Sequence, residues 1–385
     1  MPRSSISRRA LLVSSAAALG CGRRKATGFP GYCFVANRGS RSVAAVDLNR
    51  FRVRAQIPLE SAPSAILARP DAVRPRAFAL APAAGAVYEI DAASLSVRRR
   101  ARVGNQVAAL RFSPAGDALW ALCRDPAALV KIALDGLRPV RRIPLPAPPD
   151  SFEISADGRA AVASLQARSI VIASLAHGAV ERVMATGAEP SILRFQPDGR
   201  QLIAGSAPER SLTIFDVPTG KTIVRLPLPI APRHFCFDVV DGAEGGQLFV
   251  TGEGMDAVVI AFPYTTEIDQ TILAGHAPGP MAVTDTSPSY LLVSNPGSNS
   301  VTVLDVDSRK LVAVVRVGQG PGQIVITPDR PQQYALVLDE KSGDMAVIRL
   351  VTFAEPWVHH YKSASLFMLV PVGEEPVAAA VVRVG

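Results

Sequence analysis

Short apolar runs alternate along this chain with turns rich in proline, glycine and aspartate. One arrangement of runs and turns returns eight times, most completely in residues 188–228, AEPSILRFQPDGRQLIAGSAPERSLTIFDVPTGKTIVRLPL. A repeat of roughly 44 residues built from short strands is typical of a β-propeller, in which every repeat forms one blade. The third run of each repeat begins at Val43, Val87, Val130, Ile170, Leu212, Val258, Val301 and Met345.

Each repeat predicts four antiparallel strands in a meander. The first and second runs are separated by tight turns such as SPAGD (113–117), SADGR (155–159) and QPDGR (196–200). Asp-Gly between two alternating runs is a strong hairpin signal. Several third runs end on aspartate, at Asp47, Asp91, Asp216 and Asp305. We expect these carboxylates to accept hydrogen bonds from the backbone of the next turn rather than to act in catalysis.

The two ends of the repeat array complement each other. Residues 31–59 contain the second, third and fourth runs of a repeat but no first run, and EEPVAAAVVRV (374–384) is a first run alone. Pairing them completes an eighth blade and removes two open sheet edges. The sequence therefore predicts an all-β fold, a single propeller of eight four-stranded blades over residues 29–385. Seven blades are the alternative, if the weak copy at 62–103 is irregular.

The segment before the repeats has the features of an export signal. Arg3, Arg8 and Arg9 precede the apolar run 10–20, which is too short to cross a bilayer. SRRALL (7–12) resembles a twin-arginine signal, and Cys21 after AALG resembles a lipoprotein processing site. We therefore expect residues 1–20 to be the signal, Cys21 to be the candidate for lipidation and residues 21–28 to be a linker. The predicted location is periplasmic, or membrane-anchored as a lipoprotein at the cell surface.

The charge of the chain favours no specialised partner. The formal net charge is +8, and removal of the three arginines of the signal leaves about +5. This excess is small for a dedicated nucleic-acid binder, so nucleic acid is not the expected partner. The arginine runs at 98–100 and 141–142 fall on predicted outer strands, where charge commonly discourages edge-to-edge aggregation. We expect a monomer that contacts a membrane only through a lipid anchor.

The cysteines indicate neither redox nor haem chemistry. Cys33, Cys123 and Cys236 fall in predicted strands of three different blades, so we expect buried thiols rather than disulfides. The chain has no CxxCH for haem attachment and no paired CxxC for zinc. We expect no cofactor and no metal.

Six arginines are predicted to lie in loops around one mouth of the central channel. If they converge there, their guanidinium groups suit a carboxylate or phosphate ligand. The alternative is that Asp125, Glu209, Asp256 and Asp344 neutralise them as ordinary surface charge. The six are Arg38, Arg41, Arg124, Arg168, Arg210 and Arg233.

Two histidines, His234 and His276, fall in predicted connectors near the same mouth. Neutral imidazoles can bind a metal or transfer protons. No third histidine occupies an equivalent loop, and Asp238 or Glu253 would have to complete a metal site. A hydrogen-bonded structural role is the alternative.

A longer segment, VTFAEPWVHHYKSAS (351–365), replaces the usual turn between the third and fourth strands of the last full repeat. It is predicted on the opposite face and carries Trp357, His359, His360 and Tyr361. Such side chains contribute strongly to protein contacts, which makes this insertion a candidate partner-binding site. The alternative is that its aromatic residues pack back against the blade.

The repeat also resembles a known family. The pattern P-x-x-[IL]-x-[FI]-x-P-D-G-[RK] followed by S-[VL]-T-[VI]-[FL]-D-V-x-[TS]-[GR]-K is similar to that of the YVTN-repeat, YncE-like β-propellers, most specifically at 188–228 and 278–317. The resemblance implies an exported or surface-displayed binding or adhesion module without a shared catalytic set. Because the family motif is structural, no functional residue is carried over.

These features favour an exported, non-enzymatic binding module whose partner is a protein or a small anionic ligand. The alternative is a hydrolase or lactonase acting on a small molecule in the channel, as in related propellers.

Overall fold

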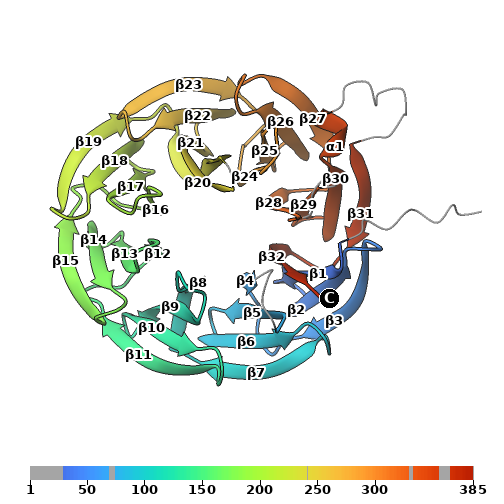
Figure 1. Cartoon of the computed structure of the whole chain (residues 1–385), viewed down its shortest axis with the longest axis horizontal. Helices are drawn as coiled ribbons and strands as arrows, with labels where there is room; N and C mark the ends of the chain where they lie inside the picture. Colours follow the sequence, from blue (N-terminus) through green and yellow to red (C-terminus); the bar gives the residue numbers. More distant parts are fainter. Residues whose placement is uncertain (1–28, 69–73, 241, 329–332, 355–364, 385) are drawn as a thin grey trace, which may run out of the picture.

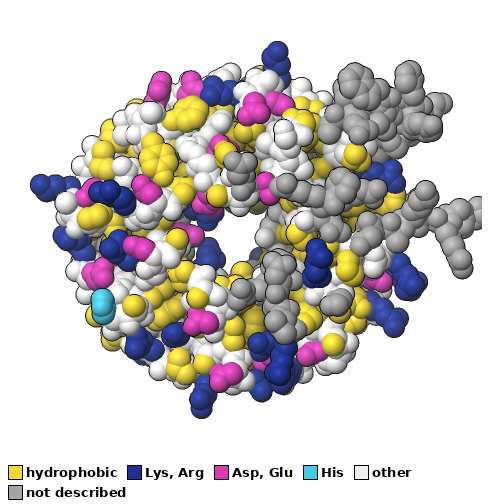
Figure 2. Space-filling model, in the orientation of Figure 1, with side chains coloured by type: hydrophobic (Ala, Val, Ile, Leu, Met, Phe, Trp, Pro, Cys, Tyr) yellow, Lys and Arg dark blue, Asp and Glu magenta, His cyan; other side chains and the backbone are white. Residues whose placement is uncertain are grey.

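The chain forms a closed ring of eight antiparallel sheets around an open channel (Figures 1 and 2). The computed structural model describes residues 29–68, 74–240, 242–328, 333–354 and 365–384. We name the sheets blades A to H in ring order, starting with the one that contains β1. The eight-bladed prediction is confirmed. The seven-bladed alternative is wrong, because the weak copy forms a complete four-stranded sheet.

Blade A contains both ends of the described chain, and the next three blades each use four consecutive strands. Blade A has β1 (Gly31–Asn37), β2 (Ser42–Asp47), β3 (Arg52–Pro58) and β32 (Pro376–Arg383). Blade B has β4 (Ala65–Ala68), β5 (Arg76–Ala81), β6 (Ala86–Asp91) and β7 (Ser96–Arg102). Blade C has β8 (Gln106–Phe112), β9 (Ala118–Asp125), β10 (Ala128–Ala133) and β11 (Arg138–Pro144). Blade D has β12 (Ser151–Ile154), β13 (Arg159–Ser164), β14 (Ser169–Ser174) and β15 (Ala179–Ala185).

The remaining blades repeat this order, with the first strand innermost and the fourth on the outer rim (Figure 1). Blade E has β16 (Ile192–Phe195), β17 (Gln201–Ser206), β18 (Ser211–Asp216) and β19 (Lys221–Pro227). Blade F has β20 (Ala231–Val240), β21 (Ala243–Glu253), β22 (Ala257–Phe262) and β23 (Glu267–Leu273). Blade G has β24 (Met281–Val283), β25 (Tyr290–Asn295), β26 (Ser300–Asp305) and β27 (Leu311–Arg316). Blade H has β28 (Pro321–Ile326), β29 (Tyr334–Asp339), β30 (Asp344–Arg349) and β31 (Leu366–Pro371).

Ring closure rests on one strand pair. β32 pairs with β1 in antiparallel register from Gly31 opposite Arg383 to Asn37 opposite Pro376, with a bulge after Ala36. β32 thereby supplies the inner strand that the first repeat lacks, as the sequence predicts.

The core lies between the blades. The second and third strands of most blades are buried along nearly their whole length, so both of their faces are apolar. Each buried cluster joins two neighbouring blades; one contains Trp120 of blade C and Phe152 of blade D. Continuous apolar runs, rather than strict alternation, are therefore what this architecture requires of its central strands.

The aspartates that end the third strands hold the turns that follow them. Asp47 accepts a hydrogen bond from the Asn49 amide at 2.8 Å, and Asp91 accepts from the amides of Ala93 and Ser94 at 2.9 Å. Asp216 and Asp305 accept from the amides of Thr219 and Ser308. The structural role predicted for these residues is confirmed.

The three described cysteines form no disulfide, as predicted, and Cys33 and Cys123 are buried, whereas Cys236 is only partly buried. Cys33, Cys123 and Cys236 lie in β1, β9 and β20 of three blades, and all are free thiols. Burial raises the pKa of Cys33 to about 12 and that of Cys123 to about 11, so both thiols stay protonated near neutral pH.

Side chains of the outer strands link neighbouring blades. Arg141 and Arg182 donate to the carbonyl oxygens of Ala176 and Pro218 in the next blade, at 2.8 and 3.0 Å. In the opposite direction, Arg142, Arg225 and Gln56 donate to carbonyl oxygens at the end of the preceding blade: Val103, Thr186 and Val372. Bonds to a carbonyl leave the guanidinium charge in place, so these arginines stabilise the ring and remain cationic.

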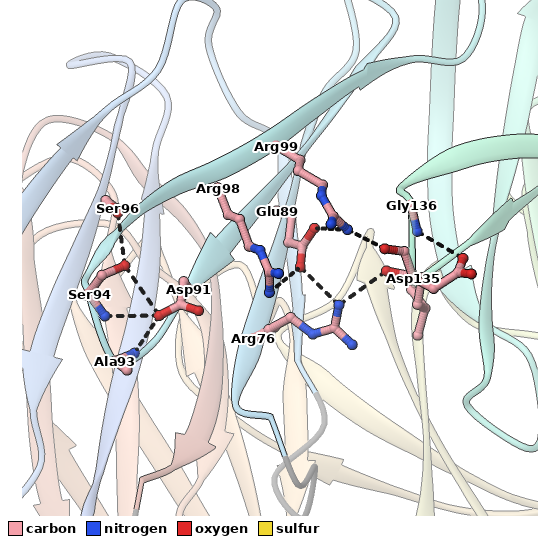
Figure 3. A network of polar contacts seen from close by, with 11 residues as sticks. Arg76, Glu89, Asp91, Ala93, Ser94, Ser96, Arg98, Arg99, Asp135 and Gly136 are labelled. Atoms are coloured by element: carbon pink, nitrogen blue, oxygen red, sulfur yellow. Dashed lines mark hydrogen bonds and ion pairs between the residues drawn. The ribbon is translucent and has the colours of Figure 1, made fainter.

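A buried carboxylate organises the largest group of arginines on the rim. Glu89 of β6 is fully buried and forms ion pairs with Arg76, Arg98 and Arg99, the closest at 2.9 Å (Figure 3). Arg76 also donates to the Leu134 carbonyl, and Arg99 to that of Asp135, so the network spans blades B and C. A buried carboxylate needs such partners, because an uncompensated charge in the interior is costly.

The insertion after β30 begins with a short helix, α1 (Val351–Ala354), in place of a turn. Phe353 stacks edge-on against Tyr290 of blade G, with ring centroids 5.8 Å apart. No helix in the described ranges is long and apolar enough to span a bilayer.

One buried position carries a charge that its equivalents lack. The residue of the second strand that pairs with the first residue of the third strand is Asn37 in blade A, Asn295 in blade G and Asp339 in blade H. The Asn295 amide oxygen accepts a hydrogen bond from Gly275 at 3.1 Å, whereas neither carboxylate oxygen of Asp339 has a partner of good geometry among the described residues. Burial raises the pKa of Asp339 to about 7; the nearby Gly318 amide opposes this shift, and the charge of Asp344 adds to it.

We predict that Asp339→Asn stabilises the protein above pH 7. The folded-state pKa lies above the unfolded value of about 3.9, so the stability of the natural protein falls as pH rises through this interval and then stays constant. The variant has no such loss. Its unfolding free energy should exceed that of the natural protein by about 4 kcal/mol at pH 8, with a gap that closes towards pH 4. Thermal unfolding between pH 4 and pH 8 measures it.

Asp91→Asn is the matched control. Hydrogen bonds, first from the Ser94 amide, lower the pKa of Asp91, so this change should destabilise the protein near pH 7 and matter less at low pH. If both variants shift the midpoint in the same direction at pH 8, the assigned role of Asp339 is wrong.

Candidate functional site

One face of the ring carries the loops between second and third strands together with the connectors between blades. Backbone hydrogen bonds tie the two sets: the amides of Leu59, Thr186 and Leu228, each just after a fourth strand, donate to the carbonyls of Arg41, Arg168 and Arg210. The loops and connectors therefore lie on the same side of the ring, as predicted, and we call this side the channel mouth.

The arginines of the mouth do not converge on one site. Four of them pair with carboxylates: Arg38 with Glu375, Arg124 with Asp150, Arg168 with Glu189 and Arg233 with Glu253, at 2.6 to 3.2 Å. Three of these acidic partners lie in connectors between blades. The carboxylates expected to neutralise the arginines have other partners, since Asp125 accepts from Asn105, Glu209 from Ser206 and Asp256 from His276.

Three of the mouth arginines also have a backbone role that the sequence did not reveal. Arg41, Arg168 and Arg210 have φ values of 48°, 45° and 43°, in the left-handed region. Glycine occupies the equivalent place in two other blades, at Gly85 and Gly343. The turn geometry therefore selects this position, whatever the side chain does.

A pocket of about 680 Å³ opens at the mouth between blades F and G. It brings together both predicted histidines and Arg233, with Glu253 and Asp256 beside them. His276 lies in the connector, as predicted, but His234 lies within β20 rather than in a connector, because that strand already begins at Ala231. A bulge between Pro232 and His234 shifts the register of the strand at this point.

The two imidazoles differ in their environment. His234 makes no hydrogen bond through its ring with any described residue, and burial, aided by the charge of Arg233, lowers its pKa. It is therefore neutral near pH 7, with one donor and one acceptor nitrogen. The Nδ1 of His276 lies 2.9 Å from Asp256 Oδ2, and the Ala277 amide also donates to Asp256. This dyad orients His276 and leaves its Nε2 for other contacts.

Arg233 and Glu253 form the charged wall of the pocket. Both Nε and one terminal nitrogen of Arg233 donate to the same Glu253 oxygen, at 3.1 and 3.0 Å. Because a guanidinium has five N–H groups, several remain for a ligand. Asp238, which a metal site with the two histidines would need if Glu253 did not complete it, accepts a hydrogen bond from the Gln247 amide and does not line this pocket.

A metal site is not assembled by these residues. Within the described part of the chain, no group of three or more histidine, cysteine, aspartate or glutamate side chains is placed to hold a metal ion.

Sequence reasoning missed a charged ladder on the inner strands. Glu153 of β12 lies between Arg111 of β8 and Arg194 of β16, at 3.7 and 3.3 Å, and Arg194 also contacts Glu244 of β21. Burial lowers the pKa of Arg194, but the charges of Glu153 and Glu244 outweigh it and the net shift is upward. Single charges at matching places in consecutive first runs, such as SFEISA and SILRFQ, were the available signal.

A second hollow, of about 830 Å³, lies at the mouth between blades H and A and is lined by Arg38, Lys341 and three glutamates. Its lining carries two basic and three acidic side chains, which is a net negative charge, and no imidazole or aromatic ring lines it. The F–G pocket is therefore the better candidate.

Several predicted residues fall outside the described ranges. Cys21 and the export segment precede Phe29, and Trp357, His359, His360 and Tyr361 lie between 355 and 364.

Comparison with known proteins identifies the fold but not a family. No family model matches the chain, and no curated protein does either. Solved structures with the same fold include dihydro-heme d1 dehydrogenase NirN in complex with DHE, with 18% identity and a TM-score of 0.70 over 89% of this chain and 73% of that one. Kuenenia stuttgartiensis hydrazine synthase is 20% identical, with a TM-score of 0.57 over 74% of this chain and 95% of that one. The computationally designed Ika8 protein is 12% identical, with a TM-score of 0.66 over 84% of this chain and 92% of that one. The similarity to YVTN-repeat propellers remains a resemblance of sequence.

We predict that Arg210→Gly leaves the fold intact and stabilises it slightly. Glycine adopts the left-handed conformation of this position without strain, so the gain should be up to about 1 kcal/mol, seen as an unchanged or higher thermal midpoint. Arg124→Gly is the control: Arg124 lies in a strand and bonds Asp150 and the Pro149 carbonyl, so its midpoint should fall. A clear loss for Arg210→Gly would show that its guanidinium, not its backbone, matters for stability.

Proposed function

We propose that this propeller is a binding module whose F–G pocket takes a small anionic ligand carrying a carboxylate. The observation that supports this most is the His234 imidazole, which lines the pocket, is neutral and has no partner for its ring nitrogens among the described residues. Half-buried polar groups generally find a hydrogen-bond partner, and a ligand would supply one.

The neighbouring groups suit an acid. Arg233 provides a cation with free N–H groups, and His234 adds a neutral donor that a carboxylate oxygen accepts. The two carboxylates of the lining already have partners, Glu253 in Arg233 and Asp256 in His276 and the Ala277 amide, so an acid would share the Arg233 guanidinium with Glu253. Fold neighbours that include two named enzymes and a designed protein support no particular activity, so the proposal depends on this pocket alone.

We propose further that the protein acts outside the cytoplasm, on the strength of the twin-arginine-like segment and Cys21. This part of the proposal is independent of the pocket.

The pocket is tested with a panel of small carboxylates that includes benzoate, succinate and citrate, using ligand-observed NMR and then calorimetry. We expect at least one acid to bind. His234→Gln and Arg233→Gln should each weaken it about tenfold or more, since a hydrogen bond to a charged group contributes about 1.5–3 kcal/mol.

His177→Gln is the matched control, because His177 is exposed on a turn of blade D and, among the described residues, forms hydrogen bonds with Ser174 alone. It should not change the affinity. Failure of every acid to bind, or binding that neither pocket variant weakens, overturns the proposal.

A hydrolase is the second candidate, and the Asp256–His276 dyad is what favours it. A carboxylate that orients an imidazole through Nδ1 leaves Nε2 placed to act as a general base towards water. Proton release from a small aliphatic lactone would measure this activity, and we expect His276→Asn to abolish it while His177→Gln does not. One equivalent of tightly bound metal, lost in His234→Ala, would favour a metal-dependent version and contradict the binding proposal.

A further inference from the structure

The outer rim of the ring is divided into three sectors by charge. The fourth strands of blades A, B and C (β3, β7 and β11) carry no acidic residue and nine arginines. Those of blades D, E and F carry three basic and three acidic residues, and those of G and H carry a single arginine. The nine arginines are Arg52, Arg54, Arg98, Arg99, Arg100, Arg102, Arg138, Arg141 and Arg142, and we call them the basic sector.

The charge of the basic sector is only partly compensated. Glu89 and Glu60 are the carboxylates that pair with it, through Arg98, Arg99 and Arg100. Arg141 and Arg142 bond backbone carbonyls, which leaves their charge in place. The side chains of Arg52, Arg54 and Arg138 are exposed and form no hydrogen bond or ion pair with any described residue. Figure 2 shows lysine and arginine side chains projecting along the edge that these blades occupy in Figure 1.

Discouraging aggregation does not explain this concentration. One or two charges per edge strand suffice for that purpose, as the mixed strands of blades D to F show. Three adjacent strands with one sign of charge instead create a field that attracts an anionic partner. We propose that the basic sector rests on an anionic membrane surface.

The shape of the rim is compatible with a planar partner. Eight blades around a ring are rotated about 45° from one another, and a rim radius of roughly 20 Å follows from four strands at their usual spacing plus the channel. When blade B touches a plane, the outer strands of A and C are then about 6 Å further away, which is within the Debye length of about 8 Å. The arginines of all three blades can therefore contribute to the electrostatic attraction to the membrane.

The side chains between the arginines also suit lipid better than nucleic acid. Val97 and Val140 lie among them with 36% and 50% of their surface exposed, and apolar side chains beside cations favour the interface of a bilayer. β3, β7 and β11 contain no aromatic residue on which a base could stack.

The test is co-sedimentation of the full chain with vesicles, in a Cys21→Ser background so that no acyl group at that position contributes. We expect binding to vesicles of phosphatidylcholine with one-third phosphatidylglycerol, weak binding to phosphatidylcholine alone, and loss of the difference at high salt. The triple variant Arg52→Glu, Arg54→Glu, Arg138→Glu should reduce binding to anionic vesicles at least about tenfold. Its thermal midpoint should stay close to that of the parent.

The matched control is Lys221→Glu, Lys310→Glu, Arg316→Glu, which changes net charge equally at exposed positions of blades E and G. It should weaken binding far less. An equal loss in both triple variants would mean that net charge alone acts and would overturn the proposal. So would equal binding to neutral and anionic vesicles, or binding of a DNA duplex or heparin without binding to vesicles.

Discussion

The pairing of β1 with β32 is the constraint on which the other seven blades depend. It joins Gly31 and Arg383, which lie more than three hundred positions apart in the sequence. Bringing such distant residues together costs conformational entropy before the contacts between them contribute to stability. Without it, the inner edge of blade A would be unpaired, and the ring would no longer keep every blade packed against two neighbours. Every buried cluster spans a blade boundary, so an opening at one boundary removes support from the next.

The same ring separates two kinds of surface. Its mouth is built from loops whose backbone is fixed by repeated hydrogen bonds. Among the residues that the structure describes, only the F–G boundary, where β20 bulges, places an unpartnered imidazole beside an arginine. Its rim is built from fourth strands that are free to differ in composition, because only one of their edges is paired. A small ligand at the mouth and an extended surface at the rim can therefore coexist without competing for residues.

Much of the fold could be predicted because it depends on features that recur. Asp91 and Asp216 serve the same turn in different blades, so each copy supports the interpretation of the other. The site could not be predicted to the same extent, because it depends on what differs between copies. Nothing local in the sequence links Arg124 to Asp150 or Asp256 to His276, which meet across loops of separate strands. Likewise, the left-handed backbone conformation of Arg210 could not be predicted, because glycine, its usual sequence signal, is absent at this position.

The register of the closing pair has a mechanical consequence. Gly31 and Arg383 face each other at one end of the β1–β32 ladder, so the two ends of the described chain lie at the same edge of blade A. A pull applied through them would load the hydrogen bonds one after another, as in unzipping, rather than all together in shear. The ring would thus open at a low force while the other seven blades stay intact, which makes the closing strand the weakest point of the molecule under tension.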